Sequence, residues 1–176
     1  MHEVERINQS RVDSFIKKVK GELWVLRGKR IGVWGLSFKP CTDDVRCAPS
    51  LTVIRRLIAE GALVRAYDPQ AMERAKAELP EIEYCADAYS VAEGAEAVLA
   101  LTEWEEFLRL DLDKVRNKMA RPLIIDGRNM FSRSILTAHG LEYVDIGRGS
   151  AFLLDFSKNI AAFQSKGGQI TSQARV

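Results

Sequence analysis

Residues 30–50 read RIGVWGLSFKPCTDDVRCAPS. Residues 30–36 form a short, largely apolar run punctuated by glycine, which is typical of a strand buried on both faces of a parallel sheet. Pro49 then begins a helix that reaches about residue 58, because proline is favoured in the first helical turn. The polar residues between strand and helix are therefore expected at the carboxyl edge of the sheet, where open α/β sheets bind ligands.

The loop between this strand and helix carries two cations, Lys39 and Arg46, and two carboxylates, Asp43 and Asp44. Lys39 offers a compact charge to a phosphate or sugar oxygen, and Arg46 offers a planar fork suited to bidentate contacts. Arg128 follows a later apolar run, so we expect it to reach the same sheet edge as Lys39. Together with the amides at the helix start, these residues favour a phosphorylated ligand. The alternative is a charged surface loop in which the two aspartates neutralise Arg46.

The rest of the sequence alternates short apolar segments with segments rich in helix formers. Further strands are predicted at residues 62–67, 82–85, 97–101, 122–125 and 141–144. Further helices are predicted at residues 70–79, 88–93, 112–119 and 132–138, with a turn at 102–107. This alternation predicts an α/β fold, namely a Rossmann-like three-layer α/β/α domain with a mostly parallel sheet and right-handed crossovers.

The chain divides into three predicted parts. Residues 1–27 form a long N-terminal helix, because apolar residues recur in steps of three, four or seven between Val4 and Leu26. This helix either packs along the domain or pairs with a helix of another chain. Residues 28–148 are the Rossmann-like domain, and residues 149–176 lose the alternation and form a C-terminal tail.

Composition excludes several classes of protein. A length of 176 residues suffices for one well-packed domain but is short for the two that a dinucleotide-dependent dehydrogenase needs. With 26 basic and 24 acidic residues the net charge is +2, which points neither to nucleic acid nor to an anionic membrane. No apolar run approaches the roughly 20 residues of a membrane span, and the polar start is no signal peptide, so we expect a cytoplasmic protein.

The cysteines and histidines predict neither a metal site nor thiol catalysis. Three cysteines without a CxxC pair indicate neither a disulfide framework nor a zinc site. Cys41 and Cys47 flank the charged loop, but His2 and His139 lie far from them in the sequence. We therefore expect reduced thiols without a catalytic role.

The dinucleotide fingerprint G-x-G-x-x-G is absent from the first strand. Its glycines, Gly32 and Gly35, have the wrong spacing, and Trp34 and Leu36 are too large for close approach of a pyrophosphate. Asp68 ends the second strand, where a ribose-binding acid often lies, but with the following proline it equally starts a turn, which is the interpretation we favour. Hydrolase, metalloprotease and P-loop motifs are also absent, so a binding part fits better than a complete enzyme.

Taken together, these motifs resemble the C-terminal UDP-sugar-binding domain of the UDP-glucose 6-dehydrogenase family, within the wider UDP-glucose/GDP-mannose dehydrogenases. The resemblance runs from about residue 4 to 148, and its most specific parts are GLSFKP at 35–40, TDDVR at 42–46, APS at 48–50, YDP at 67–69, LTEW at 101–104 and IDGRN at 125–129. Members of that family oxidise the C6 alcohol of the sugar twice with NAD, by way of a cysteine nucleophile.

The resemblance implies roles for four residues. Phe38 and Lys39 would contact the nucleotide sugar and Arg128 the uridine side. Arg46 would reach NAD bound by another domain. The helix of residues 1–27 resembles the end of the family's central dimer-forming region, which implies other copies of the chain or a full-length dehydrogenase as partners.

The sequence departs from the family in what it lacks. It contains neither the NAD-binding domain nor the glycine-rich motif with the catalytic cysteine, and Cys41 and Cys47 do not match that cysteine. No catalytic residue is therefore predicted. The first hypothesis is a nucleotide-sugar-binding part of an NAD-dependent UDP-glucose 6-dehydrogenase. The second is a stand-alone, non-catalytic UDP-sugar-binding or dimerisation module, and the third, an independent dinucleotide-binding protein, is disfavoured by the wrong pyrophosphate turn.

Overall fold

The computed structural model describes residues 2–146, with the side chains of residues 10 and 12–146; the predicted tail at 149–176 lies outside the described residues. A parallel six-stranded sheet has the order β3-β2-β1-β4-β5-β6. The strands are β1 (Arg30–Trp34), β2 (Leu63–Tyr67), β3 (Glu83–Tyr84), β4 (Ala97–Ala100), β5 (Leu123–Asp126) and β6 (Glu142–Asp145). The helices are α1 (His2–Leu23), α2 (Pro49–Ala59), α3 (Met72–Glu78), α4 (Ala88–Ala92), α5 (Glu105–Leu108), α6 (Leu112–Lys118) and α7 (Arg133–Ala138).

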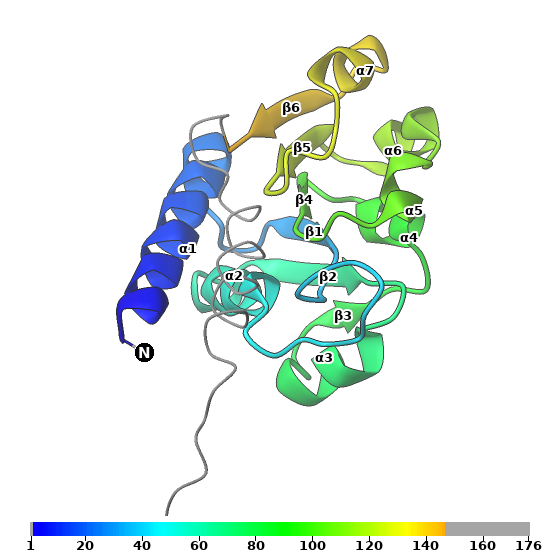
Figure 1. The fold of residues 1–176 in the computed structure, drawn as a ribbon. Helices are drawn as coiled ribbons and strands as arrows, with labels where there is room; N and C mark the ends of the chain where they lie inside the picture. Colours follow the sequence, from blue (N-terminus) through cyan, green and yellow to red (C-terminus); the bar gives the residue numbers. More distant parts are fainter. Residues whose placement is uncertain (1, 147–176) are drawn as a thin grey trace, which may run out of the picture.

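The molecule has three layers, a central sheet with helices on both faces, and an apolar cluster lies on each face between the sheet and its helices (Figure 1). One cluster joins α1, α2 and α3 to one face of the sheet, and it includes Ile31 and Val33 of β1. The other joins α4, α5, α6 and α7 to the opposite face, and it includes Trp34. Successive residues of a strand point to opposite faces, so the apolar run in β1 contributes to both clusters. The predicted Rossmann-like α/β fold with a parallel sheet is confirmed.

The N-terminal helix ends earlier than predicted. Trp24 adopts a left-handed backbone conformation (φ 62°), which stops α1 at Leu23, whereas the pattern extends it to Leu26. Leu26 is nevertheless buried, so it contributes to the core from the connection that follows the helix. The apolar spacing thus correctly predicts that Leu26 is buried, but not that its backbone lies outside the helix.

The described part of α1 packs on the same core as the sheet. Its buried side chains are Val12, Phe15, Ile16, Val19 and Leu23. Two ion pairs also hold α1 in place: Asp13 with Arg56 of α2 at 2.6 Å, and Lys20 with Glu60, the residue after α2, at 2.7 Å. In this stretch the apolar side chains of α1 are buried against the chain's own core, which agrees with the interpretation of the helix as one that packs along the domain.

The strand order creates a divergence between β1 and β4. The chain leaves β1 toward β2 on one side and leaves β4 toward β5 on the other, so the loops after these neighbouring strands separate. Ligands of open α/β sheets bind at such a switch point, at the carboxyl ends of the strands. The loop of residues 35–48 begins there, as the sequence predicts.

Candidate functional site

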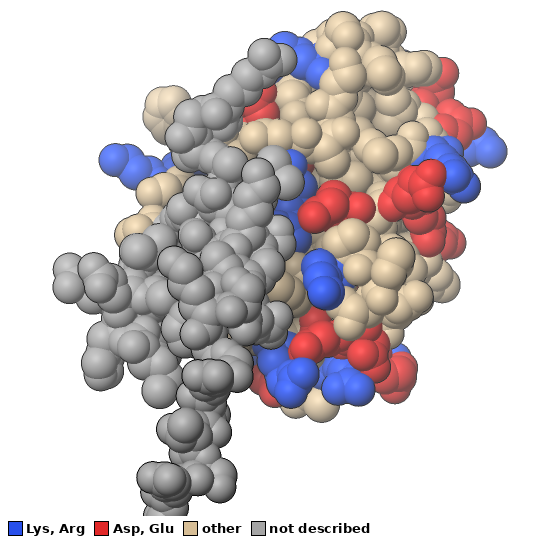
Figure 2. Space-filling view, viewed as in Figure 1, with Lys and Arg blue, Asp and Glu red and all other residues tan. Residues whose placement is uncertain are grey.

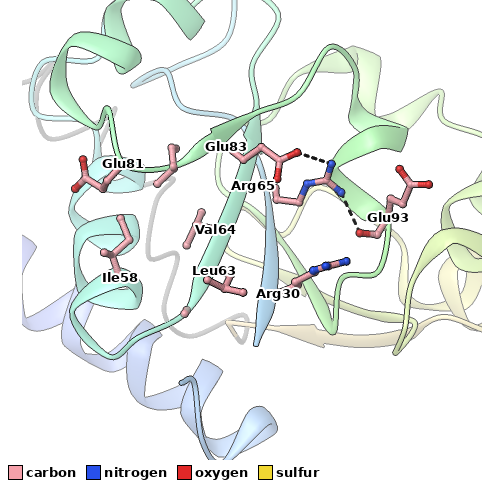
Figure 3. Close-up of a pocket in the computed structure, with 10 residues that line it drawn as sticks. Arg30, Ile58, Leu63, Val64, Arg65, Glu81, Glu83 and Glu93 are labelled. Atoms are coloured by element: carbon pink, nitrogen blue, oxygen red, sulfur yellow. Dashed lines mark hydrogen bonds and ion pairs between the residues drawn. The ribbon is translucent and has the colours of Figure 1, made fainter. Parts of the chain in front are cut away.

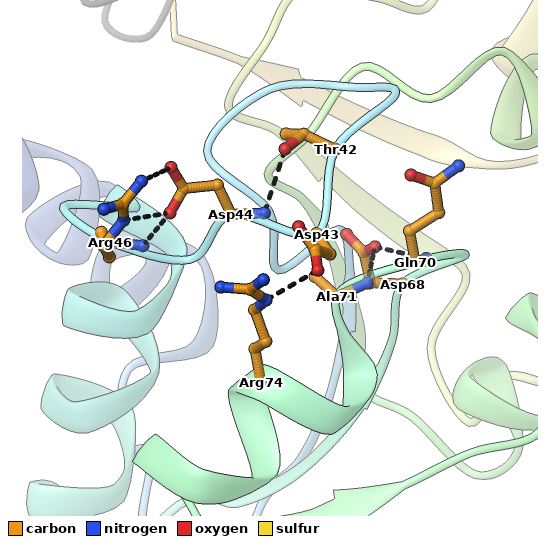
Figure 4. A network of polar contacts seen from close by, with 8 residues as sticks. All are labelled: Thr42, Asp43, Asp44, Arg46, Asp68, Gln70, Ala71 and Arg74. Carbon is orange, nitrogen blue, oxygen red and sulfur yellow. Dashed lines mark hydrogen bonds and ion pairs between the residues drawn. The ribbon is translucent and has the colours of Figure 1, made fainter.

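Asp68, the residue after β2, organises the carboxyl edge of the sheet. It is 1% exposed, and its Oδ1 accepts hydrogen bonds from the backbone N–H of Gln70 at 2.9 Å and Ala71 at 2.8 Å (Figure 4). These bonds close the turn before α3, because an aspartate side chain can satisfy the amides two and three residues ahead. The turn interpretation of Asp68 is confirmed.

The second oxygen of Asp68 binds the loop after β1, which the sequence does not predict. Oδ2 accepts from the backbone N–H of Leu36 at 2.7 Å and of Ser37 at 3.0 Å, and from Oγ of Ser37 at 3.0 Å. It also accepts from the indole Nε1–H of Trp104 at 3.1 Å. One buried carboxylate therefore connects the loops that follow β1, β2 and β4.

The loops after β1 and β4 meet at Gly35 and Thr102. Gly35 has a φ of 93°, and a Cβ on it would overlap Cβ of Thr102 and lie 2.6 Å from the Thr102 backbone nitrogen. The Thr102 hydroxyl donates to the Ser37 carbonyl at 2.7 Å. Only glycine allows this approach, because it has no Cβ and tolerates a positive φ.

Arg128 reaches the same loop from the end of β5. It is 4% exposed, and its Nη2 donates to the carbonyl of Phe38 at 2.9 Å. Its Nε lies 2.5 Å from Oε2 of Glu103, as an ion pair without hydrogen-bond alignment. Burial lowers the pKa of the Arg128 guanidinium, and Glu103 opposes this shift. The group remains a cation, because arginine does not lose its proton in proteins.

Lys39 and Phe38 lie side by side in sequence but in different environments. The ring of Phe38 is partly buried and packs against the core cluster of α1, α2 and α3. Lys39 is exposed, and its ammonium makes no ion pair within the described residues 2–146. On the part of the described surface seen in Figure 2, basic and acidic side chains are interspersed, without a broad area of one sign.

Arg46 is held by one of the two aspartates. Its Nε donates to Oδ1 of Asp44 at 2.9 Å and its Nη2 to Oδ2 at 2.8 Å (Figure 4). The hydrogen bond from Arg46 lowers the pKa of Asp44 to about 2. Asp43 instead pairs with Arg74 of α3 at 2.7 Å, so the expectation that both aspartates neutralise Arg46 holds for Asp44 alone. Asp43 points to the neighbouring helix, which sequence spacing does not reveal.

A known protein family matches the part of the chain that contains this edge of the sheet. The profile of the UDP-glucose/GDP-mannose dehydrogenase family, UDP binding domain, matches residues 32–133, which include the loop after β1, Asp68 and Arg128. The chain belongs to this family. The match is to the family's C-terminal UDP-sugar-binding domain.

Individual relatives agree with the family assignment. The chain is 41% identical over 123 residues to a UDP-glucose 6-dehydrogenase of Rhizobium meliloti, covering 70% of this chain and 28% of the relative. It is 42% identical over 142 residues to UDP-glucose 6-dehydrogenase TuaD of Bacillus subtilis, covering 80% and 31%. A solved UDP-glucose dehydrogenase of Pyrobaculum islandicum superposes with a TM-score of 0.67 at 31% identity, covering 81% and 30%. The chain thus spans about a third of the length of these relatives.

The first turn of this UDP-binding domain does not fit a dinucleotide. The amides of Leu36 and Ser37, which follow β1, donate to Asp68 and are not available to a pyrophosphate. The helix after the loop begins with Pro49, which has no N–H. The sequence lacks the dinucleotide fingerprint, and in the structure the Asp68 carboxylate accepts the hydrogen bonds of the amides in this turn.

Two pockets lie outside the loop after β1. One, of about 760 Å³, begins with Asn129, the residue after Arg128, and is further lined by Phe131, Ser132, Arg133, Ser134, Thr137, Tyr143 and Asp145. The Oδ1 of Asn129 is buried and has no hydrogen-bond partner in the described part of the chain.

The other pocket, of about 490 Å³, lies beside the first residues of β1 and β2 (Figure 3). Its Arg65 donates to Glu83 at 2.7 Å and to the carbonyl of Glu93 at 3.0 Å, so the protein itself pairs this charge.

The three cysteines and His139 lie in different environments. Cys41 and Cys47 are exposed, and burial raises the pKa of the Cys85 thiol. His139 is paired with Asp113 at 3.0 Å. Among residues 2–146 no cluster of three metal-ligating side chains occurs, and no helix there has the length and apolar composition of a membrane span.

The sequence motifs predict no role for Glu103, Trp104 or the second oxygen of Asp68. Glu103 and Trp104 directly follow the apolar run of β4, and Trp104 is 7% exposed with its indole N–H bonded to Asp68. The sequence did offer a signal for both residues. Each is a polar or hydrogen-bonding side chain just after the end of a buried strand, where ligand sites of such sheets lie.

Proposed function

We propose that this chain binds a UDP-sugar at the carboxyl edge of its sheet, as the nucleotide-sugar-binding part of an NAD-dependent UDP-glucose 6-dehydrogenase that converts UDP-glucose to UDP-glucuronate. The observation that carries the proposal is the contact of Arg128 with the Phe38 carbonyl, which brings two segments 90 residues apart to one place. Lys39, whose side chain is exposed, is the next residue after Phe38. The 41–42% identity to enzymes named UDP-glucose 6-dehydrogenase supports UDP-glucose as the substrate.

The proposed roles follow from charge and position. Lys39 contacts the diphosphate or sugar oxygens as a compact cation, and Phe38 lines the same part of the site. Arg128 contacts the uridine side, where the 760 Å³ pocket and the unpaired acceptor of Asn129 follow it. Arg46 is exposed and contacts NAD, the cofactor of the complete enzyme, which is held by a part of the enzyme outside this sequence. That part also supplies the catalytic cysteine, so this chain binds without turnover.

Titration of the chain with UDP-glucose, UDP and NAD, followed by NMR of the protein, tests the proposal. We expect saturable shifts near Lys39 and Arg128 with UDP-glucose and UDP, and little change with NAD. Shifts that saturate with NAD alone would instead indicate a dinucleotide-binding protein. No response to any of the three, together with self-association in sedimentation, would favour the dimerisation module.

The Lys39→Ala variant is expected to bind UDP-glucose about 10- to 100-fold more weakly, because a charge-assisted contact contributes roughly 1.5–3 kcal/mol. Its melting temperature should not change, since the ammonium makes no ion pair within the described residues. The measurement is the Kd from the NMR titration, with Lys76→Ala as the control, because Lys76 is a surface lysine of α3 paired with Glu73. An unchanged Kd in Lys39→Ala would remove Lys39 from the site.

The Arg46→Ala variant is expected to leave UDP-glucose affinity within about twofold of the unaltered chain, because the Arg46 side chain is 83% exposed and paired with Asp44. When the chain is joined to the dehydrogenase part of a relative, the same variant should lower turnover by at least about tenfold through weaker NAD binding. Steady-state kinetics with varied NAD, measured beside the UDP-glucose titration, separate the two effects. A parallel loss of UDP-glucose affinity would show that Arg46 contacts the sugar nucleotide instead.

A further inference from the structure

Two groups that bind a dinucleotide in many Rossmann-type domains bind each other in this one. The amides after the first strand ordinarily face a pyrophosphate, and the acid after the second strand ordinarily binds a ribose. Here Oδ2 of Asp68 accepts from the amides of Leu36 and Ser37 at 2.7 and 3.0 Å. A carboxylate of the protein therefore stands where a ligand's anion would otherwise lie.

The six groups that donate to Asp68 come from three separate loops. The Asp68 network consists of Asp68 and the donors Leu36 N, Ser37 N, Ser37 Oγ, Gln70 N, Ala71 N and Trp104 Nε1. Asp68, Ser37 and Trp104 are 1%, 1% and 7% exposed, so water does not compete for these bonds. Because every donor faces the same carboxylate, its loss affects all three loops together.

The Asp68 network leads directly into the proposed site. The carbonyl of Ser37 accepts from the Thr102 hydroxyl at 2.7 Å, and the next carbonyl, that of Phe38, accepts from Arg128 at 2.9 Å. The orientation of the Ser37 peptide thus sets the direction of the Phe38 carbonyl and the starting point of Lys39. A change at Asp68 would therefore alter the positions of Phe38 and Lys39, since only the peptide between Ser37 and Phe38 separates the Ser37 amide from them.

We propose that Asp68 is a positioning residue for nucleotide binding, an internal anion that fills the amide pair after β1 and so fixes Phe38, Lys39 and Arg128 in their binding arrangement. This inference rests on the proposed function, because it concerns the same site. Asp68 itself has no role in contacting the ligand, since both of its oxygens are engaged within the protein.

The Asp68→Ala variant is expected to bind UDP at least about tenfold more weakly than the unaltered chain, because six donors lose the carboxylate and the Ser37 peptide is no longer held. The Trp104 indole N–H alone keeps a second acceptor, Oγ of Ser37 at 3.2 Å. The deleted carboxylate leaves a space lined by N–H and O–H donors, which a formate ion matches in charge and shape. Sodium formate should therefore restore most of the UDP affinity to Asp68→Ala, whereas sodium chloride at equal ionic strength should not.

Two matched variants separate positioning from general destabilisation. Asp68→Asn retains the shape but places an amide NH₂ among donors, so it should also weaken UDP binding and should not respond to formate. Val115→Ala removes buried apolar volume from α6 but no hydrogen bond of the Asp68 network, and should lower the melting temperature without changing UDP affinity. UDP affinity that falls equally in Val115→Ala and Asp68→Ala, or that formate leaves unrestored, would overturn the proposal.

The unaltered chain offers a test that does not depend on any variant folding. It has three tryptophans, and only the indole N–H of Trp104 belongs to the Asp68 network, whereas that of Trp34 donates to the Ala88 carbonyl and Trp24 is 86% exposed. Saturating UDP should shift the Trp104 indole resonance and leave that of Trp24 in place. An unmoved Trp104 resonance, alongside saturable shifts at Lys39, would contradict the inference.

The outcomes for the two proposals differ. If the unaltered chain shows no response to UDP or UDP-glucose, the proposed function fails. If the unaltered chain binds UDP and Asp68→Ala binds it equally well, the proposed function stands and the role of Asp68 fails.

Discussion

The Gly35→Ala variant is expected to lose about 3–5 kcal/mol of folding free energy, a large part of the roughly 5–15 kcal/mol that a domain has. Two costs add at this position. An alanine at a φ of 93° is strained, and its Cβ would lie 2.6 Å from the backbone nitrogen of Thr102, which cannot move without displacing the loop after β4. Urea unfolding followed by circular dichroism measures the loss.

Gly28→Ala is the matched control for the backbone strain. Gly28 also has a positive φ, of 76°, but no atom lies within 4 Å of a Cβ built on it. Its substitution should therefore cost only the conformational part, about 1–2 kcal/mol. If the two variants were equally stable, the contact between the loops after β1 and β4 would not be as close as described.

The Arg128→Met variant is expected to abolish detectable UDP binding and to lower the folding free energy by about 2–3 kcal/mol. Loss of one partner from a buried ion pair typically costs about 3–5 kcal/mol because the other charge remains uncompensated. The expected loss for Arg128→Met lies below or at the low end of this range, because the Glu103 side chain is 31% exposed and keeps part of its hydration. The binding loss has a separate cause, because the Phe38 carbonyl loses its donor and the site loses its buried cation.

A double variant separates these two causes. Adding Glu103→Gln to Arg128→Met removes the uncompensated charge, so the stability should recover in part while UDP binding stays absent. Arg65→Met is the control for loss of a partly buried, paired arginine, because Arg65 donates to Glu83 at 2.7 Å and to the Glu93 carbonyl at 3.0 Å in the pocket outside the proposed site. Recovery of UDP binding in the double variant would show that Arg128 acts only by holding the fold.

The alternation of elements was predictable, and the ends of elements were less so. Apolar runs of four to six residues between helix-forming segments identify β1, β4 and β5, whose residues face both core clusters. The third strand is reduced to Glu83–Tyr84, because it lies at the sheet edge and pairs only with β2. The helix end at Leu23 depends on the positive φ of Trp24, a residue type that carries no such preference.

The sequence alone determined the parallel α/β architecture, the position of the charged loop after β1 and the family, because these depend on periodicity and on local motifs. The tertiary structure decided which of these groups meet. Arg128 donates to the Phe38 carbonyl, Asp43 pairs with Arg74, and Asp68 accepts from six donors in three loops. Such pairings depend on strand order and on burial, which bring residues far apart in the chain together and remove the water that would otherwise satisfy them.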